Sequence, residues 1–263
     1  MANPQISIIM TIYNHEKFIT KSIKSVLNQS YKKWELIAIE NGSKDLSAKI
    51  LKSFKDNKIK KKFLKKNIGR TNALNLALRM CKGKFIAIQD SDDISHKKRL
   101  KIQLEYFKKK EHCWILGTNY SLFNESKNFK KRIDVFKTLN KKRNFLFKNP
   151  LAHSTIMFRK DLIKKIGNYP GSFKYAQDYA FYLKAFKKYN FHFIKNNLVK
   201  INYIHDESET MRLSKNKIIY IENLKILLWV NKNFELSPRE KFRLLFQMLN
   251  LLCKILLKSF NQF

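Results

Sequence analysis

The chain has 263 residues, of which 44% are hydrophobic and 13% aromatic, so it can form one large domain, alone or with an appendage, and wholesale disorder is excluded. Its net charge of +35 fits a polyanionic partner, such as nucleic acid, an anionic membrane or a phosphorylated substrate, and equally fits lysines that are only solvated. No uncharged apolar run approaches the roughly 20 residues of a spanning helix, and the three cysteines are far apart. We therefore expect a soluble or peripheral protein, without a signal peptide, in a reducing cytosolic compartment.

Strands alternate with helical patterns through the first half of the chain. The predicted strands are 6–12, 34–39, 61–65 and 84–89, and the predicted helices are about 15–29, 44–56, 70–81 and 96–110. This rhythm is typical of βαβ units, so it predicts an α/β fold with a Rossmann-like, mostly parallel sheet flanked by helices.

The second half is less regular. Residues 113–135 predict strand and hairpin structure, and 154–158 predict a further strand. A short helix is expected from Asp161 and a clear one at about 177–189. After Tyr203 the pattern is helical to the end of the chain.

Carboxylates follow two of the predicted strands. Asp90-Ser91-Asp92-Asp93 follows strand 84–89, and Glu40 ends strand 34–39. Ligands of open α/β sheets bind at the carboxyl edge of the strands. Two aspartates this close repel each other unless a cation is present, and a hard divalent cation suits them. The competing interpretation is a helix-capping cluster, but we favour a metal–nucleotide site.

Several motifs, in the same order, resemble family 2 glycosyltransferases over about residues 5–210, and among them the bacterial enzymes of surface-polysaccharide and lipopolysaccharide assembly. The segments that carry the resemblance are Ile8 to Asn14, Ser22 to Tyr31, Glu40 to Asp45, Asn67-Ile68-Gly69 with Ala73-Leu74-Asn75, Gln89 to Ser95 with Arg99-Leu100, Asn149 to Thr155, Gln177-Asp178-Tyr179 and Tyr203-Ile204-His205.

The resemblance implies a GT-A fold and an inverting sugar transfer from a nucleotide-diphosphate donor, by default a UDP-sugar. Thr11 and Tyr13 would then flank the base, and Glu40 would hydrogen-bond it. Arg70 would contact phosphate or base, and Asp90 the ribose. The family more often has Asp at position 40 and Arg at position 74, so the Glu and Leu found here are departures.

The resemblance also implies the catalytic groups. Asp92 would coordinate Mn²⁺ or Mg²⁺ on the diphosphate, with His205 as a second candidate ligand. Asp178 would be the catalytic base that takes the proton of the acceptor hydroxyl. Without the resemblance, Asp178 would be interpreted as an acid that favours a helix N-terminus, and His205 as a structural histidine.

The C-terminal part lies outside the resemblance. We predict a catalytic domain at 1–210 and a helical extension at 211–263. Between residues 239 and 260 the polar residues Arg243, Gln247, Asn250, Lys254 and Lys258 form one narrow stripe on an otherwise apolar helix. Such a helix either lies in a membrane interface or packs on the domain with one face exposed.

The sequence therefore predicts a metal-dependent hexosyl- or N-acetylhexosaminyltransferase on the inner face of the membrane. Its expected partners are a nucleotide-sugar donor, a glycan or lipid-linked glycan acceptor and an anionic membrane surface. The alternatives are a catalytically inactive GT-A-like binding module and a polyanion- or nucleic-acid-binding protein. The ordered carboxylates at the strand ends argue against nucleic acid as the partner.

Overall fold

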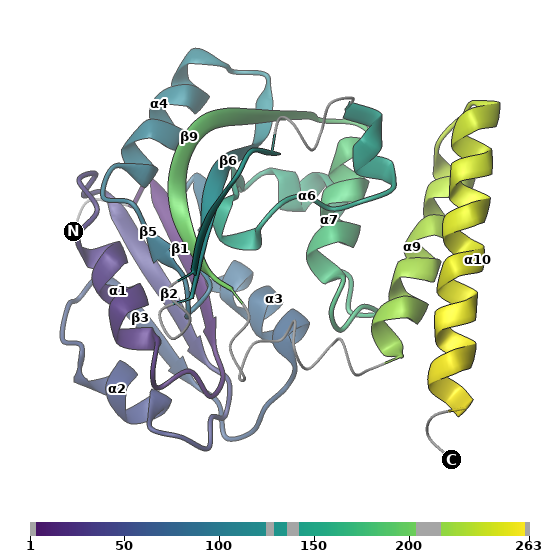
Figure 1. Ribbon diagram of the computed structural model, residues 1–263. Helices are drawn as coiled ribbons and strands as arrows, with labels where there is room; N and C mark the ends of the chain where they lie inside the picture. Colours follow the sequence, from purple (N-terminus) through teal and green to yellow (C-terminus); the bar gives the residue numbers. More distant parts are fainter. Residues whose placement is uncertain (1–3, 125–128, 136–141, 204–216, 261–263) are drawn as a thin grey trace.

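A computed structural model describes residues 4–124, 129–135, 142–203 and 217–260. Its nine-stranded sheet has the order β3-β2-β1-β4-β8-β6-β9-β5, with β7 beside β6 (Figure 1). The strands are β1 (Ile6–Ile12), β2 (Trp34–Glu40), β3 (Ile59–Phe63), β4 (Phe85–Ile88), β5 (Ile94–Ser95), β6 (Cys113–Asn124), β7 (Phe129–Ile133), β8 (Met157–Arg159) and β9 (Asn190–Asn202). The helices are α1 (Ile19–Leu27), α2 (Ser47–Ser53), α3 (Arg70–Met80), α4 (Arg99–Lys109), α6 (Leu162–Ile166), α7 (Gln177–Phe186), α9 (Ile218–Asn233) and α10 (Pro238–Phe260), with 3₁₀ turns η1 (Lys142–Leu146) and η2 (His153–Thr155).

The first half of the sheet is parallel, as predicted. β1 lies between β2 and β4 and pairs with both in parallel, while β3 extends the sheet beyond β2. β2 and β4 are buried along their whole length, because helices cover both faces of a parallel sheet. Ile12 pairs with Glu40, so the carboxyl ends of β1 and β2 lie side by side.

The second half of the sheet is mixed. β8 is antiparallel to both β4 and β6, whereas β9 runs parallel to β6 and antiparallel to β5. The long strand β9 is absent from the sequence prediction, since its polar residues interrupt the alternation and its register with β6 shifts near Asn119. This strand matters for the site because its last residue, Asn202, reaches the acidic loop after β4.

The C-terminal helices pack directly on the rest of the chain. Leu227 and Val230 of α9 and Leu244 of α10 are buried in the same apolar cluster as Leu74 of α3 and Phe181 of α7. Figure 1 shows α9 and α10 side by side at the edge of the molecule, with α10 outermost. The division into domains at residue 210 stays a prediction.

Candidate active site

An ion pair connects α3 with the acidic loop after β4. A guanidinium nitrogen of Arg70 lies 2.6 Å from Asp90 Oδ1 and 3.2 Å from His153 Nδ1. His153 Nδ1 itself is 3.7 Å from the same Asp90 oxygen. Burial by itself would raise the pKa of Asp90, but the positive charge of Arg70, assisted by the nearby His153 ring, outweighs it and holds this pKa well below its ordinary value. Asp90 is therefore ionised at any physiological pH.

Hydrogen bonds from two neighbouring segments hold the acidic loop in place. The Asp90 N–H donates to Ser154 Oγ at 2.8 Å, and the Ser154 hydroxyl donates to Asp93 Oδ2 at 2.5 Å. The other Asp93 oxygen accepts the Asn202 N–H at 3.0 Å. Asp93 is buried, and burial together with the nearby Asp92 and Asp90 raises its pKa. Asp93 therefore joins the loop to η2 and β9 and is not available to a ligand.

A fully buried arginine lies behind the loop. The guanidinium of Arg99, the first residue of α4, is 1% exposed and donates only to groups inside the protein. Burial lowers the pKa of Arg99 to about 10, against the charges of Asp93 and Asp90, so it stays protonated at neutral pH. Its acceptors are the side chains of Gln89, Ser95 and Gln103 and the carbonyls of Ile88 and Ile156.

Asp178 lies in the first turn of α7, within the electrostatic field of the ion pair. Its carboxylate accepts the Tyr179 N–H at 2.7 Å and the Asn149 amide at 3.3 Å. Burial raises the pKa of Asp178 and Asp90 adds to the rise, whereas the charges of His153 and Arg70 oppose it. Asp178 is therefore near enough to Asp90 and Arg70 for their charges to act on it, and its role as a base stays a prediction.

The segment before α7 is held by a residue that the sequence analysis did not find. Glu222 of α9 is buried, and its carboxylate accepts three successive backbone N–H groups. Lys174 donates to Oε1 at 2.6 Å, while Tyr175 and Ala176 each donate to Oε2 at 2.9 Å. The start of the helix that carries Asp178 is therefore fixed from the C-terminal part of the chain. Only the long-range pairing reveals this role, since nothing in the sequence near Glu222 indicates it.

The predicted base-binding residues lie at the ends of β1 and β2. Thr11 and Tyr13 are half-buried at the end of β1. Glu40 is buried and accepts the backbone N–H of Ser43 at 2.8 Å and that of Gly42 at 3.2 Å, one on each carboxylate oxygen. These two bonds shape the turn after β2 and leave lone pairs on both oxygens for a further donor.

The structure describes one of the two predicted metal ligands. Asp92 is half-buried in the loop after β4, and His205 lies outside the described residues. Within the described ranges, no group of three His, Cys, Asp or Glu side chains gathers into a metal centre. A carboxylate at a strand end nevertheless has the donor chemistry that Mn²⁺ or Mg²⁺ requires when phosphate oxygens complete the coordination. The residues present fit such a metal.

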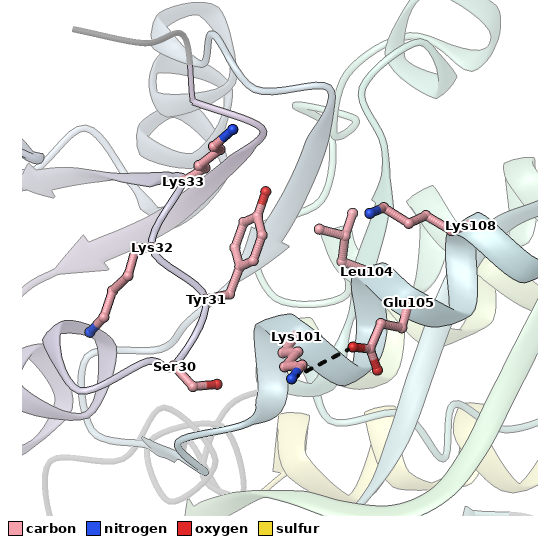
Figure 2. Close-up of a pocket in the computed structure, with 8 residues that line it drawn as sticks. All are labelled: Ser30, Tyr31, Lys32, Lys33, Lys101, Leu104, Glu105 and Lys108. Atoms are coloured by element: carbon pink, nitrogen blue, oxygen red, sulfur yellow. Dashed lines mark ion pairs between the residues drawn. The ribbon is translucent and has the colours of Figure 1, made fainter.

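A separate groove of about 400 Å³ lies between the loop before β2 and the middle of α4 (Figure 2). Tyr31 on one wall donates to Gln5, which precedes β1, so the groove lies at the amino ends of the central strands, away from the acidic edge. Its four lysines are exposed, and surface lysines alone do not form a site.

Residues 7–167 match the family model described as Glycosyl transferase family 2. The chain belongs to this family. Among curated relatives, the O-antigen biosynthesis glycosyltransferase WbnJ of Escherichia coli is 38% identical over 182 residues, which cover 68% of this chain and 70% of the relative. An uncharacterised glycosyltransferase of Methanocaldococcus jannaschii is 30% identical over 242 residues, covering 88% of this chain and 82% of the relative.

Solved structures confirm the GT-A fold of this family 2 glycosyltransferase. TarS of S. aureus in complex with UDP-GlcNAc matches 94% of this chain and 72% of its own, with a TM-score of 0.72 and 23% identity. The mannosyltransferase PcManGT of Pyrobaculum calidifontis, in complex with GDP-Man and Mn²⁺, matches 94% of this chain and 69% of its own, with a TM-score of 0.67 and 16% identity. At these identities the likeness establishes the fold, and the individual site residues stay predictions.

Proposed function

We propose that this protein transfers a sugar, with inversion, from a UDP-sugar to a glycan or lipid-linked glycan during assembly of a surface polysaccharide. The position of the buried Asp178 within electrostatic reach of the Arg70–Asp90 ion pair carries the proposal. The relative WbnJ, named for O-antigen biosynthesis, and TarS, solved with UDP-GlcNAc, support the acceptor and donor classes.

Asp178 is the proposed general base. Inversion requires the acceptor hydroxyl to attack from the face opposite the departing nucleotide, and a carboxylate beside that hydroxyl takes its proton as the bond forms. Burial raises the pKa of Asp178, which makes the ionised carboxylate a stronger base than an exposed aspartate. Its hydrogen bonds to Tyr179 and Asn149 hold it in one orientation.

The nucleotide is proposed to lie along the ends of β1, β2 and β4. Glu40 accepts an N–H of the base, with Thr11 and Tyr13 on either side of the ring. Asp90 accepts from the ribose, and Arg70, already charged and 24% exposed, meets the diphosphate. The diphosphate must therefore compete with Asp90 for this guanidinium.

Asp92, with His205 as the second candidate, would hold the divalent metal. When bound, Mn²⁺ or Mg²⁺ neutralises the charge that develops on the departing diphosphate. PcManGT, solved with GDP-Man and Mn²⁺, supports a metal in this fold. The described residues contain no helix long and apolar enough to cross a bilayer. We propose a peripheral position on the cytoplasmic face of the membrane, where the donor would be supplied.

The first test is calorimetric binding of UDP, GDP, dTDP and CDP, each with and without Mn²⁺. We expect UDP to bind only with the metal, and Asp92→Ala to abolish this metal-dependent binding. Asp178→Asn should retain UDP binding but slow sugar transfer by about 10²–10⁴-fold. Asp161→Asn is the matched control, because Asp161 is an exposed residue that precedes α6 and makes no capping hydrogen bond to it.

Two results would contradict the proposal. A near-normal transfer rate in Asp178→Asn would place the base elsewhere. Absence of nucleotide binding by the folded protein would favour the inactive binding module, and salt-sensitive binding of a polyanion without metal would favour the nucleic-acid alternative.

A further inference from the structure

The outermost helix, α10, exposes an apolar face. Leu244 packs into the core, and Met248, Leu251 and Ile255 follow it at helical spacing toward α9. The opposite side of the helix is open to solvent, and Phe242 is 73% exposed and Phe246 65%. The exposed apolar residues of this face are Phe242, Leu245, Phe246, Leu249, Leu252, Leu256 and Leu257.

The polar stripe of the helix does not form this face. The Arg243 guanidinium lies 4.6 Å from the Phe147 ring centroid and donates to Asn144, both on the catalytic side. Lys254 and Lys258 each place the ammonium 5.9 Å from the Tyr220 ring of α9. A helix that merely packed on the domain would turn the stripe outward and bury the leucines. Here the cations flank the body of the protein, and leucine and phenylalanine are left open.

A contiguous apolar face of this kind needs a partner. The two simplest partners are a second copy of the chain and a lipid surface, and electrostatics distinguishes them. Residues 217–263 contain eight Lys and Arg against three Glu, and the whole chain carries +35. A second copy would bring the same positive charge to the interface, whereas an anionic lipid surface attracts it.

We propose that the exposed face of α10 inserts into the interfacial layer of an anionic lipid bilayer, with the helix parallel to the surface. Phenylalanine and leucine then enter the boundary between headgroups and acyl chains, and the cations beside them meet phosphate groups. The inference assigns a surface to the peripheral membrane position proposed above. Because this surface contains none of the proposed site residues, it does not depend on the proposed reaction.

The test is flotation of the full chain with vesicles of equimolar phosphatidylglycerol and phosphatidylcholine, against phosphatidylcholine alone. We expect binding to the anionic vesicles, weaker by at least about tenfold on the neutral ones. Phe246→Glu with Leu249→Glu should lower the partition coefficient by at least ~100-fold, roughly tenfold for each buried side chain lost. The matched control is Leu46→Glu, which changes an equally exposed leucine beside α2 and should bind within about twofold of the parent.

A second measurement does not require a charged substitution. In Phe246→Trp, the fluorescence of the added tryptophan should be quenched by brominated phosphatidylglycerol. The fluorescence of the tryptophan added on β3 in Phe63→Trp should not be quenched. Equal vesicle binding by the double glutamate variant, or an unquenched Trp at position 246, would overturn the proposal. A lipid-free dimer that dissociates in the double variant would overturn it as well, in favour of a second copy.

Discussion

Replacing Glu222 by Gln tests whether the C-terminal helices support the catalytic helix. The substitution keeps the shape of the side chain and removes its charge. A carbonyl oxygen at the Oε2 position can still accept from Tyr175 and Ala176, but the new amide group faces the Lys174 N–H, and that 2.6 Å bond is lost. Hydrogen bonds to a charged group contribute about 1.5–3 kcal/mol, and neutral ones about 0.5–1.5. The carboxylate also has a desolvation penalty that the variant avoids, so we expect a net loss of about 2–3 kcal/mol.

The functional effect follows from the position of Asp178, two residues after the last of these donors. A base displaced by a fraction of an ångström loses its alignment with the acceptor, and a 1 Å error can reduce the rate by about 10²-fold. We expect Glu222→Gln to lower kcat about tenfold while UDP affinity is unchanged. Urea unfolding measures the stability, and calorimetry and initial rates measure the other two quantities.

Glu235→Gln is the control, because Glu235 is an exposed glutamate just beyond α9 and its change should stay within about 0.5 kcal/mol. If Glu222→Gln unfolds like this control, the three bonds do not stabilise the fold as argued. If it is destabilised but keeps its kcat, Glu222 supports the fold without positioning the base.

Three further changes have definite expected outcomes. By urea unfolding, Asp178→Asn should be more stable than the parent near pH 7 and equally stable near pH 3. Burial raises the pKa of Asp178 in the folded protein above 3.8, so the parent loses stability as the pH rises through that higher value. Equal stability of variant and parent at both pH values would refute this. Arg70→Gln removes the counter-charge of Asp90 and should lower the free energy of unfolding by about 1–3 kcal/mol; an unchanged value would mean that the pair contributes nothing. Gly83→Ala would place a Cβ 2.5 Å from a β1 backbone nitrogen and should lower the free energy of unfolding by about 1–3 kcal/mol. Gly171→Ala, whose Cβ would have no atom within 4 Å, should lower it little. Similar melting temperatures of the two variants would contradict this.

The central strands are predictable because their local pattern and their final environment agree. Strands 6–12 and 34–39 are continuous apolar runs, as expected for parallel strands covered on both faces, and the structure contains them as β1 and β2. β9 is different. Its stability comes from pairing with β6, more than 60 residues earlier, and its own sequence has no regular alternation.

The candidate acids can be named from the sequence, whereas the residues that hold them in place cannot. Asp90, Asp92 and Asp178 follow from strand ends and from the family resemblance. Ser154 and Glu222 act through contacts with residues 46 to 64 positions away, which no local pattern reveals. His205 lies outside the described residues, so its proposed role has no structural context.

The attachment of α10 has a consequence for which acceptors can be used. Glu240 pairs with Arg143 of η1 at 2.6 Å, and Leu244 is buried in the core, so the helix is joined to the catalytic part by direct contacts and not by a free linker. A helix fixed in this way sets a single height and tilt of the acidic edge above any surface on which it rests. The protein would then use acceptors whose reactive hydroxyl stands at that height above the surface. Acceptors whose hydroxyl lies much nearer to the surface or much farther from it would not be used.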